Sequence, residues 1–144
     1  MPSTHPAADC TGSDDNRDFF ADAAANLKWT VYCAVLPTGW VVDVGGYRLA
    51  NGGKLEIAYR NRSGARIELH EGAFCTNAGG CVPAGSDEGE AAFGDVTGRL
   101  IAVSDGSWAL SVEGDEPISW LAIGSGMDED TFRAATEALA RIGG

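Results

Sequence analysis

The strongest constraint on the fold of this chain is a pair of alternating segments on either side of a short turn. Leu55, Ile57 and Tyr59 alternate with polar neighbours, and Ile67 and Leu69 repeat the pattern. Because successive side chains of a strand point to opposite faces, each segment predicts a strand with one buried face.

The residues between these segments determine how the two strands pair. Asn61-Arg62-Ser63-Gly64 predicts a type I turn followed by Gly64 in the left-handed conformation of a bulged hairpin, so that Asn61 faces Ala65. Counting back from the turn pairs Tyr59 with Ile67, Ile57 with Leu69 and Glu56 with His70. Every apolar residue then lies on one face, whereas a one-residue slip would divide them between two faces.

A second hairpin is expected around Asp105-Gly106, a dipeptide typical of tight turns between strands. A two-residue turn would pair Ser104 with Ser107, Val103 with Trp108 and Ile101 with Leu110. Together with Val112, these apolar residues would form another buried face.

Helices are expected near both ends of the chain. The first runs from Asp14 to Leu27 after an N-cap at Ser13, and its apolar face consists of Phe19, Phe20, Ala23, Ala24 and Leu27. The second starts after an N-cap at Asp128 and is stopped by Gly143, with an apolar stripe of Phe132, Ala135, Leu139 and Ile142. The apolar face of each helix must be buried, most simply against a sheet.

Apolar runs of strand length occupy residues 29–36, 40–49 and 118–123, whereas turn residues and acids at 72–94 predict a loop. The order is therefore a helix, then about seven strands, then a helix. We predict an α+β fold with a mostly antiparallel sheet of about 6–7 strands and an N-terminal and a C-terminal helix packed on it. Residues 1–13 should form a flexible arm and residues 14–144 a single domain.

The charge of the chain argues against some classes of partner. Asp and Glu number 21 against 10 Lys and Arg, which gives a net charge of −11. Such a surface repels phosphate backbones and anionic membranes, so nucleic acid is not an expected partner. It favours solubility or contact with a basic partner. No apolar run reaches the ~18–20 residues of a membrane span.

The four cysteines indicate the cellular compartment in which the protein works. Cys75 and Cys81 bracket a short glycine-containing loop and are expected to pair, which leaves Cys10 to pair with Cys33. Zinc sites need closer cysteine pairs than these, and free buried thiols are the remaining alternative. Disulfides favour an extracytoplasmic protein that is secreted, periplasmic or at the cell surface.

The N-terminal segment lacks the apolar stretch of a signal peptide. Ala7-Ala8-Asp9-Cys10 resembles a lipoprotein cleavage site, although Asp9 stands where a small residue is expected. A chance match and the vestige of a longer, lipoprotein-like precursor both remain open.

Few residues could carry catalysis. His70 is the one histidine in the predicted sheet, so it is the candidate base of an active site, with Glu56 or Glu71 as its carboxylate. The simpler interpretation of His70 is a surface residue that faces Glu56 across the hairpin. Solvation on strand faces likewise explains the carboxylates Glu56, Glu68, Glu71 and Glu113.

Metal and cofactor motifs are incomplete. The string that begins at His70-Glu71 has Phe74 where a zinc protease needs its second histidine. The Asp14–Asp18 segment lacks the glycine and the glutamate of a calcium loop. No glycine pattern of a phosphate-binding loop occurs, so the sequence predicts neither a cofactor nor a metal.

From Leu36 to Ile142 the chain has a layout that we compare with a known group. "LPTGW" precedes the strands "LEIAYRN" and "IELHEG", and then follow "VTGRLIAV", "ISWLAIGS" and the helix "MDEDTFRAATEAL". This layout resembles uncharacterised extracytoplasmic domains of bacterial lipoproteins and anti-sigma factors, and the wider PsbP/Mog1-like α/β/α group. The resemblance implies an antiparallel sheet flanked by helices, outside the cytoplasmic membrane, and it brings no catalytic residues.

The sequence favours a non-enzymatic extracytoplasmic binding or sensing domain of a bacterial envelope or secreted protein, with an unidentified protein or small-molecule partner. One alternative is a small hydrolase or lyase that uses His70, which a concave pocket with His70 beside a carboxylate would support. Another is a binder of a small apolar ligand. Four tryptophans are either core residues or pocket residues, and solvent-filled space behind Trp40 or Trp120 would support the binder.

Overall fold

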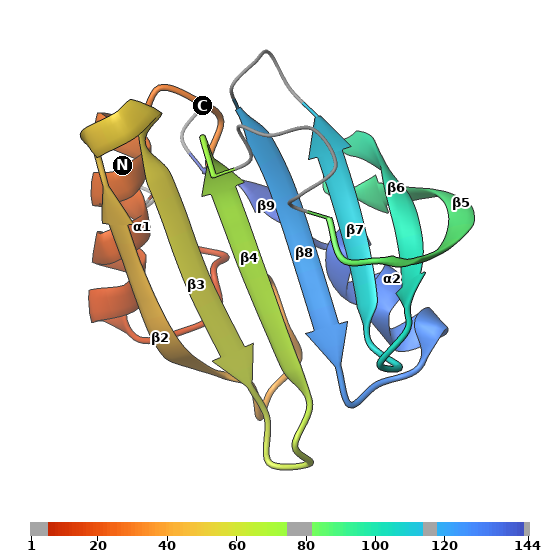
Figure 1. The fold of residues 1–144 in the computed structure, drawn as a ribbon. Coiled ribbons are helices and arrows are strands. Elements are labelled where there is room, and N and C mark those ends of the chain that lie inside the picture. Colours follow the sequence, from red (N-terminus) through yellow and green to blue (C-terminus); the bar gives the residue numbers. More distant parts are fainter. Residues whose placement is uncertain (1–5, 75–81, 114–117, 143–144) are drawn as a thin grey trace.

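The computed structural model describes residues 6–74, 82–113 and 118–142. Its main element is a seven-stranded antiparallel sheet with the strand order β2-β3-β4-β8-β7-β6-β5 (Figure 1). The strands are β2 (Val41–Arg48), β3 (Lys54–Arg60), β4 (Arg66–Gly72), β5 (Gly85–Phe93), β6 (Val96–Val103), β7 (Trp108–Glu113) and β8 (Ser119–Ser125). The predicted α+β fold with a mostly antiparallel sheet is confirmed.

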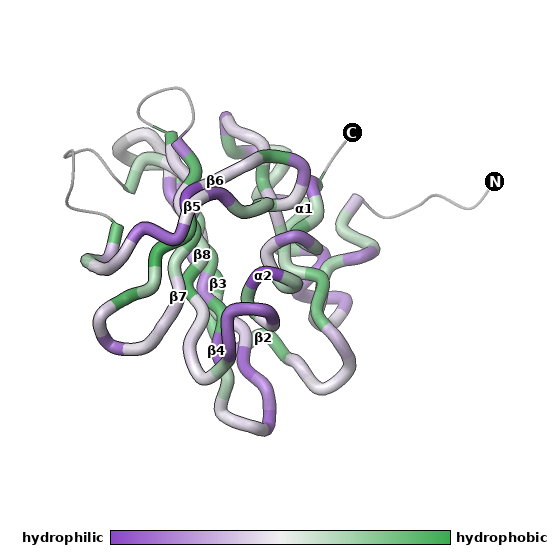
Figure 2. Tube along the Cα trace, turned by 90° about the vertical axis from the view of Figure 1, so that its right-hand side faces the viewer, coloured by the Kyte–Doolittle hydropathy of each residue, from purple (hydrophilic) through white to green (hydrophobic). Residues whose placement is uncertain are grey.

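Both helices lie on the same face of this sheet, which Figure 2 shows edge-on. They are α1 (Asp14–Asn26) and α2 (Glu129–Glu137), and a two-stranded sheet of β1 (Tyr32–Cys33) and β9 (Ala140–Arg141) completes their layer. The hydrophobic core fills the space between the two layers. We call the opposite side of the large sheet, over which no described helix packs, the helix-free face.

The predicted N-caps of both helices are confirmed, but the second helix is shorter than expected. Ser13 and Asn16 form a capping box at α1, and the Asp128 carboxylate accepts a hydrogen bond from Thr131 N at 2.8 Å. The apolar stripe does not continue as helix to Ile142, because α2 ends at Glu137. The chain then extends as β9, and Ile142 N donates to Val31 O. Strand pairing with β1 therefore replaces the last helical turn.

The register of the first hairpin is confirmed at every predicted pair. Tyr59 faces Ile67, Ile57 faces Leu69, and Glu56 faces His70 across β3 and β4. All four of the apolar residues are buried against the helix layer. Asn61 N donates to Ala65 O, and Gly64 has the predicted left-handed φ of 87°.

The predicted register of the second hairpin is wrong by one residue. Val103 N donates to Ser107 O, so the loop has three residues, and Gly106 takes a left-handed φ of 92° as Gly64 does. The pairs are Ala102 with Trp108, Ile101 with Ala109 and Leu100 with Leu110. Leu100 thus enters the core, and Ile101 is left half-buried on the helix-free face.

The loop predicted over residues 72–94 contains an edge strand, β5, which pairs with β6. Its first half carries glycine and acids, which are depleted in strands, so its sequence does not resemble one. The register shifts between Asp87 and Glu90, as in a β-bulge. Acidic residues and a bulge are common in edge strands, because both discourage pairing with another chain.

The strand predicted over residues 29–36 is reduced to the two residues of β1. Side chains of the large sheet, rather than a neighbouring strand, bind much of this backbone. Trp120 Nε1 donates to Thr30 O at 2.9 Å, Tyr32 N to Glu71 Oε1 at 3.0 Å, and Ala34 N to the Tyr59 hydroxyl at 3.1 Å.

The structure contains the predicted Cys10–Cys33 disulfide, and both cysteines are buried. The predicted Cys75–Cys81 pair lies outside the described residues. From Pro6 on, the N-terminal segment lies against the domain, where Ala7 is buried and Thr11 N donates to Ala34 O. Neither of the described helices has the length and apolar content needed to cross a membrane.

Candidate functional site

The predicted catalytic candidate His70 lies on β4, on the helix-free face, between two carboxylates. Its Nδ1 is 3.5 Å from Glu56 Oε1 and its Nε2 is 3.6 Å from Glu68 Oε1. The imidazole also packs against Phe74, with ring centroids 5.9 Å apart. The structure therefore brings together His70 and Glu56, two of the three residues that the enzyme hypothesis named.

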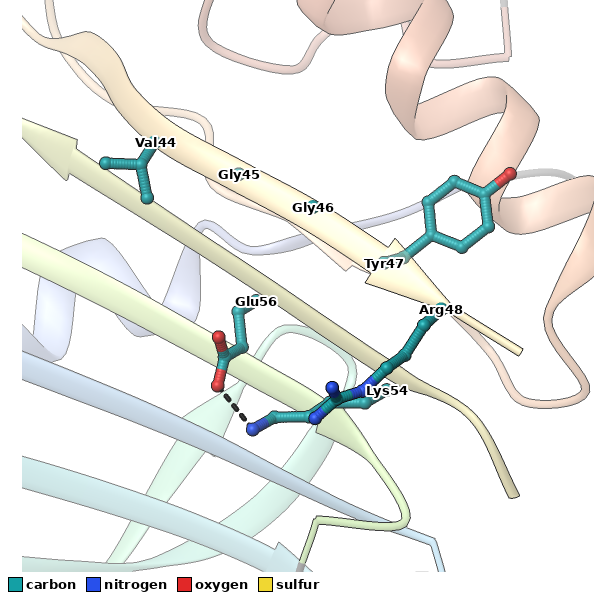
Figure 3. Close-up of a pocket in the computed structure, with 7 residues that line it drawn as sticks. All are labelled: Val44, Gly45, Gly46, Tyr47, Arg48, Lys54 and Glu56. Atoms are coloured by element: carbon teal, nitrogen blue, oxygen red, sulfur yellow. Dashed lines mark ion pairs between the residues drawn. The ribbon is translucent and has the colours of Figure 1, made fainter. Parts of the chain in front are cut away.

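Glu56 is held by a lysine rather than poised for proton transfer. Lys54 Nζ lies 2.5 Å from Glu56 Oε1, and this contact is the main reason that the pKa of Glu56 is lowered. Figure 3 shows this ion pair beside a depression of about 390 Å³, whose wall along β2 runs from Val44 through Gly45 and Gly46. Tyr47 points away from the pair, toward α1. His70 does not line the depression.

Glu71 cannot act together with His70, which corrects both its predicted roles. Adjacent residues of a strand point to opposite faces, so Glu71 enters the core while His70 faces outward. Glu71 is fully buried and is therefore not a solvated strand-face carboxylate. The signal was present in the sequence, because Glu71 continues the inward series of Ile67 and Leu69.

The buried carboxyl of Glu71 has unusual surroundings. Oε1 accepts the hydrogen bond from Tyr32 N, but neither Oε2 nor Trp29 Nε1 has a hydrogen bond of normal geometry with the described residues. Burial raises the pKa of Glu71 to about 8, and the Tyr32 amide and the indoles of Trp29 and Trp120 offset part of the increase. Through the hydrogen bond that it accepts from Tyr32 N, the Glu71 carboxyl anchors β1 to the large sheet.

A second candidate site lies on the helix side of the sheet, between α2 and the segment that leads into β2. We call it the apolar groove, and its volume is about 610 Å³. One wall consists of Val35, Leu36, Pro37 and Trp40, and Ile67 of β4 also contributes to the lining. The other wall consists of Asp130, Thr131, Ala134 and Ala135 of α2 and of its C-cap residue, Ala138.

Local sequence explains how the first wall is formed. Trp40 N lies 3.4 Å from Pro37 O across a four-residue turn, in which Gly39 has a φ of 106° that favours glycine. The turn brings Trp40 back beside Leu36. Upstream, Leu36 N donates to Thr11 Oγ1 at 2.7 Å, next to the Cys10–Cys33 disulfide. The wall is thus fixed to the N-terminal segment at one end and to β2 at the other.

The second wall is open because its residues are small. Ala134 and Ala135 of α2 and the C-cap residue Ala138 lie on one side of the helix, at spacings of one, three and four residues. Phe132, on another side of the helix, is fully buried and packs closely on Gly124 of β8. Phe132 therefore anchors α2 to the sheet, while the alanines leave space beside Trp40.

The sequence pointed to this groove only through Trp40, one of the four tryptophans weighed as pocket residues. The alanines gave no signal, since alanine is common in helices whether or not a groove is present. In the described part of the chain, no group of three or more His, Cys, Asp or Glu side chains is arranged to hold a metal ion. Comparisons with protein-family models, curated proteins and solved structures find no match.

Proposed function

We propose that this chain is a non-enzymatic extracytoplasmic binding domain that holds a small apolar ligand in the apolar groove. The observation that carries the proposal is a preformed space of about 610 Å³ with nine non-ionisable residues among its lining. Pockets for small molecules usually have volumes of about 300–1,000 Å³ and apolar walls with a few polar groups. The groove meets both criteria.

The disulfide supports the proposed compartment. Cys10 and Cys33 are paired in the structure, and stable disulfides are typical of oxidising, extracytoplasmic environments. The same bridge lies beside the hydrogen bond that holds Leu36 in the groove wall. An oxidising compartment would therefore also preserve the proposed binding site.

The alternative, a hydrolase or lyase that uses His70, has less support. Glu71 faces away from His70, and Glu56 is paired with Lys54. A base needs a bound substrate within hydrogen-bond reach, but His70 lines neither the depression of Figure 3 nor the apolar groove. The geometry therefore favours binding over catalysis.

Filling the groove is expected to weaken binding by about tenfold or more, equivalent to about 1.4 kcal/mol. Ala134 is exposed and lines the groove, so Ala134→Phe places a ring in the ligand's space without disturbing the core. Fluorescence titration with phenylnaphthylamine, an uncharged apolar dye, measures the dissociation constant.

The matched control is Ala25→Phe, because Ala25 is an exposed alanine of α1 that is not among the groove-lining residues. It should bind the dye as tightly as the native protein. Equal affinity of the native protein and Ala134→Phe would overturn the proposal, and so would the absence of saturable binding to the native protein.

A further inference from the structure

We propose that the ligand of the apolar groove is a cationic amphiphile, whose apolar body lies in the groove and whose positive group is held by Asp130 at its mouth. This inference rests on the proposed function and adds the chemical class of the ligand. It is drawn from the charge of the residues that line the groove, where the single ionisable side chain described is acidic.

Among the described residues that line the groove, Asp130 is the only ionisable one. It is exposed, and no described basic side chain forms an ion pair with it. A ligand's charged group could therefore contact this carboxylate while remaining hydrated, as the apolar body enters the groove. That division matches an amphiphile rather than a wholly apolar molecule.

The nearest base on the same helix is already engaged. Arg133 Nε lies 2.8 Å from Glu129 Oε2, and Arg133 also donates to Glu90 O at 3.4 Å. None of the 10 Lys and Arg residues of the chain lines the groove. An anionic head group, such as a carboxylate, would thus find no cation among the lining residues.

Longer-range charges act in the same direction. The start of a helix carries partial positive charge, but the first turn of α2 already contains the acids Glu129 and Asp130 after the Asp128 cap. The whole chain has a net charge of −11, which attracts cations and repels anions. A positive ligand is therefore favoured both at the groove mouth and during approach.

The test compares three ligands that share a ten-carbon chain: decyltrimethylammonium, decanol and decanoate. The two ions are used below their micelle concentrations, and decanol is used below its solubility limit. Displacement of phenylnaphthylamine at low ionic strength gives their affinities. For the native protein we expect the cation to bind about threefold to fivefold more tightly than decanol, as for an exposed charge pair, and decanoate to bind most weakly.

Asp130→Asn should reduce the preference for the cation over decanol to less than twofold and leave the affinity for decanol unchanged. The matched control is Glu137→Gln, which removes an exposed charge of α2 outside the groove lining and should keep the preference. Equal affinities for all three ligands in the native protein would refute the cationic class. A preference that survives in Asp130→Asn would refute the role of Asp130. If the dye binds but none of the three displaces it, the cationic class is refuted and the proposed function stands. If the dye itself does not bind saturably, the proposed function fails.

Discussion

Replacing Glu71 by glutamine is expected to remove a loss of stability that the native protein undergoes as the pH rises from 4.5 to about 8. In the unfolded chain the carboxyl has its ordinary pKa of 4.5, whereas burial raises the pKa in the folded state to about 8. Between these values the folded state holds a proton that the unfolded state has released. The free energy of unfolding therefore falls as the pH rises, and the loss is complete above the upper value.

The expected effect is large. Each unit of difference in pKa corresponds to about 1.4 kcal/mol, so the loss is on the order of 3 to 5 kcal/mol. Glutamine keeps an oxygen that can accept the hydrogen bond from Tyr32 N, but it has no proton to release in this range. Glu71→Gln should therefore be more stable than the native protein at pH 8, and its stability should depend less on pH.

Urea unfolding at intervals from pH 5.5 to pH 8 measures this difference. Carboxyls whose pKa is lowered, such as Asp43 and Glu56, stabilise the fold at every pH above their ordinary pKa. They lose that contribution only at lower pH, outside the range of this titration. The control is Glu113→Gln, which changes an exposed carboxylate of β7 and should retain the native pH dependence. If Glu71→Gln also retains the native pH dependence, the Glu71 carboxyl does not cause the loss of stability.

Removing the Cys10–Cys33 disulfide is expected to lower the free energy of unfolding by about 3 kcal/mol. The bridge joins residues 23 positions apart, so it excludes many conformations of the unfolded chain. Both cysteines are buried, so the double variant replaces them by alanine, which brings no polar group into the core. The loss should be greater than for a typical single surface substitution.

Urea unfolding of this double variant, without reductant, provides the measurement. Treating the native protein with reductant is less specific, since the chain has four cysteines. Peptide mapping of the native protein under non-reducing conditions should yield a fragment that links Cys10 to Cys33. A difference below about 1 kcal/mol would show that the bridge contributes little to the fold.

Local sequence predicted the elements whose apolar residues alternate or recur regularly. The first hairpin was correct in register because its turn and its inward residues agree on one pairing. The second failed because Asp105-Gly106 suits more than one loop length, and the three-residue loop moves Leu100 rather than Ile101 into the core. A dipeptide alone does not determine the length of a turn.

Other parts of the fold depend on contacts between distant segments. The backbone after Trp29 is bound by Glu71, Tyr59 and Trp120, residues that only the folded sheet brings near it. The apolar groove likewise needs the Leu36–Trp40 turn and the alanines of α2, which are about ninety residues apart in the sequence. No local pattern could predict that these two walls face each other.

The most direct test of the account is the location of the bound ligand. Phenylnaphthylamine is titrated into protein labelled with nitrogen-15, and the amide chemical shifts are followed by NMR. The shifts report which residues the dye approaches. We predict saturable shifts that are largest at Leu36, Trp40, Ala134 and Ala138, on the two walls of the apolar groove. Largest shifts at His70 and Glu56 on the helix-free face, or no saturable shifts at all, would contradict the account.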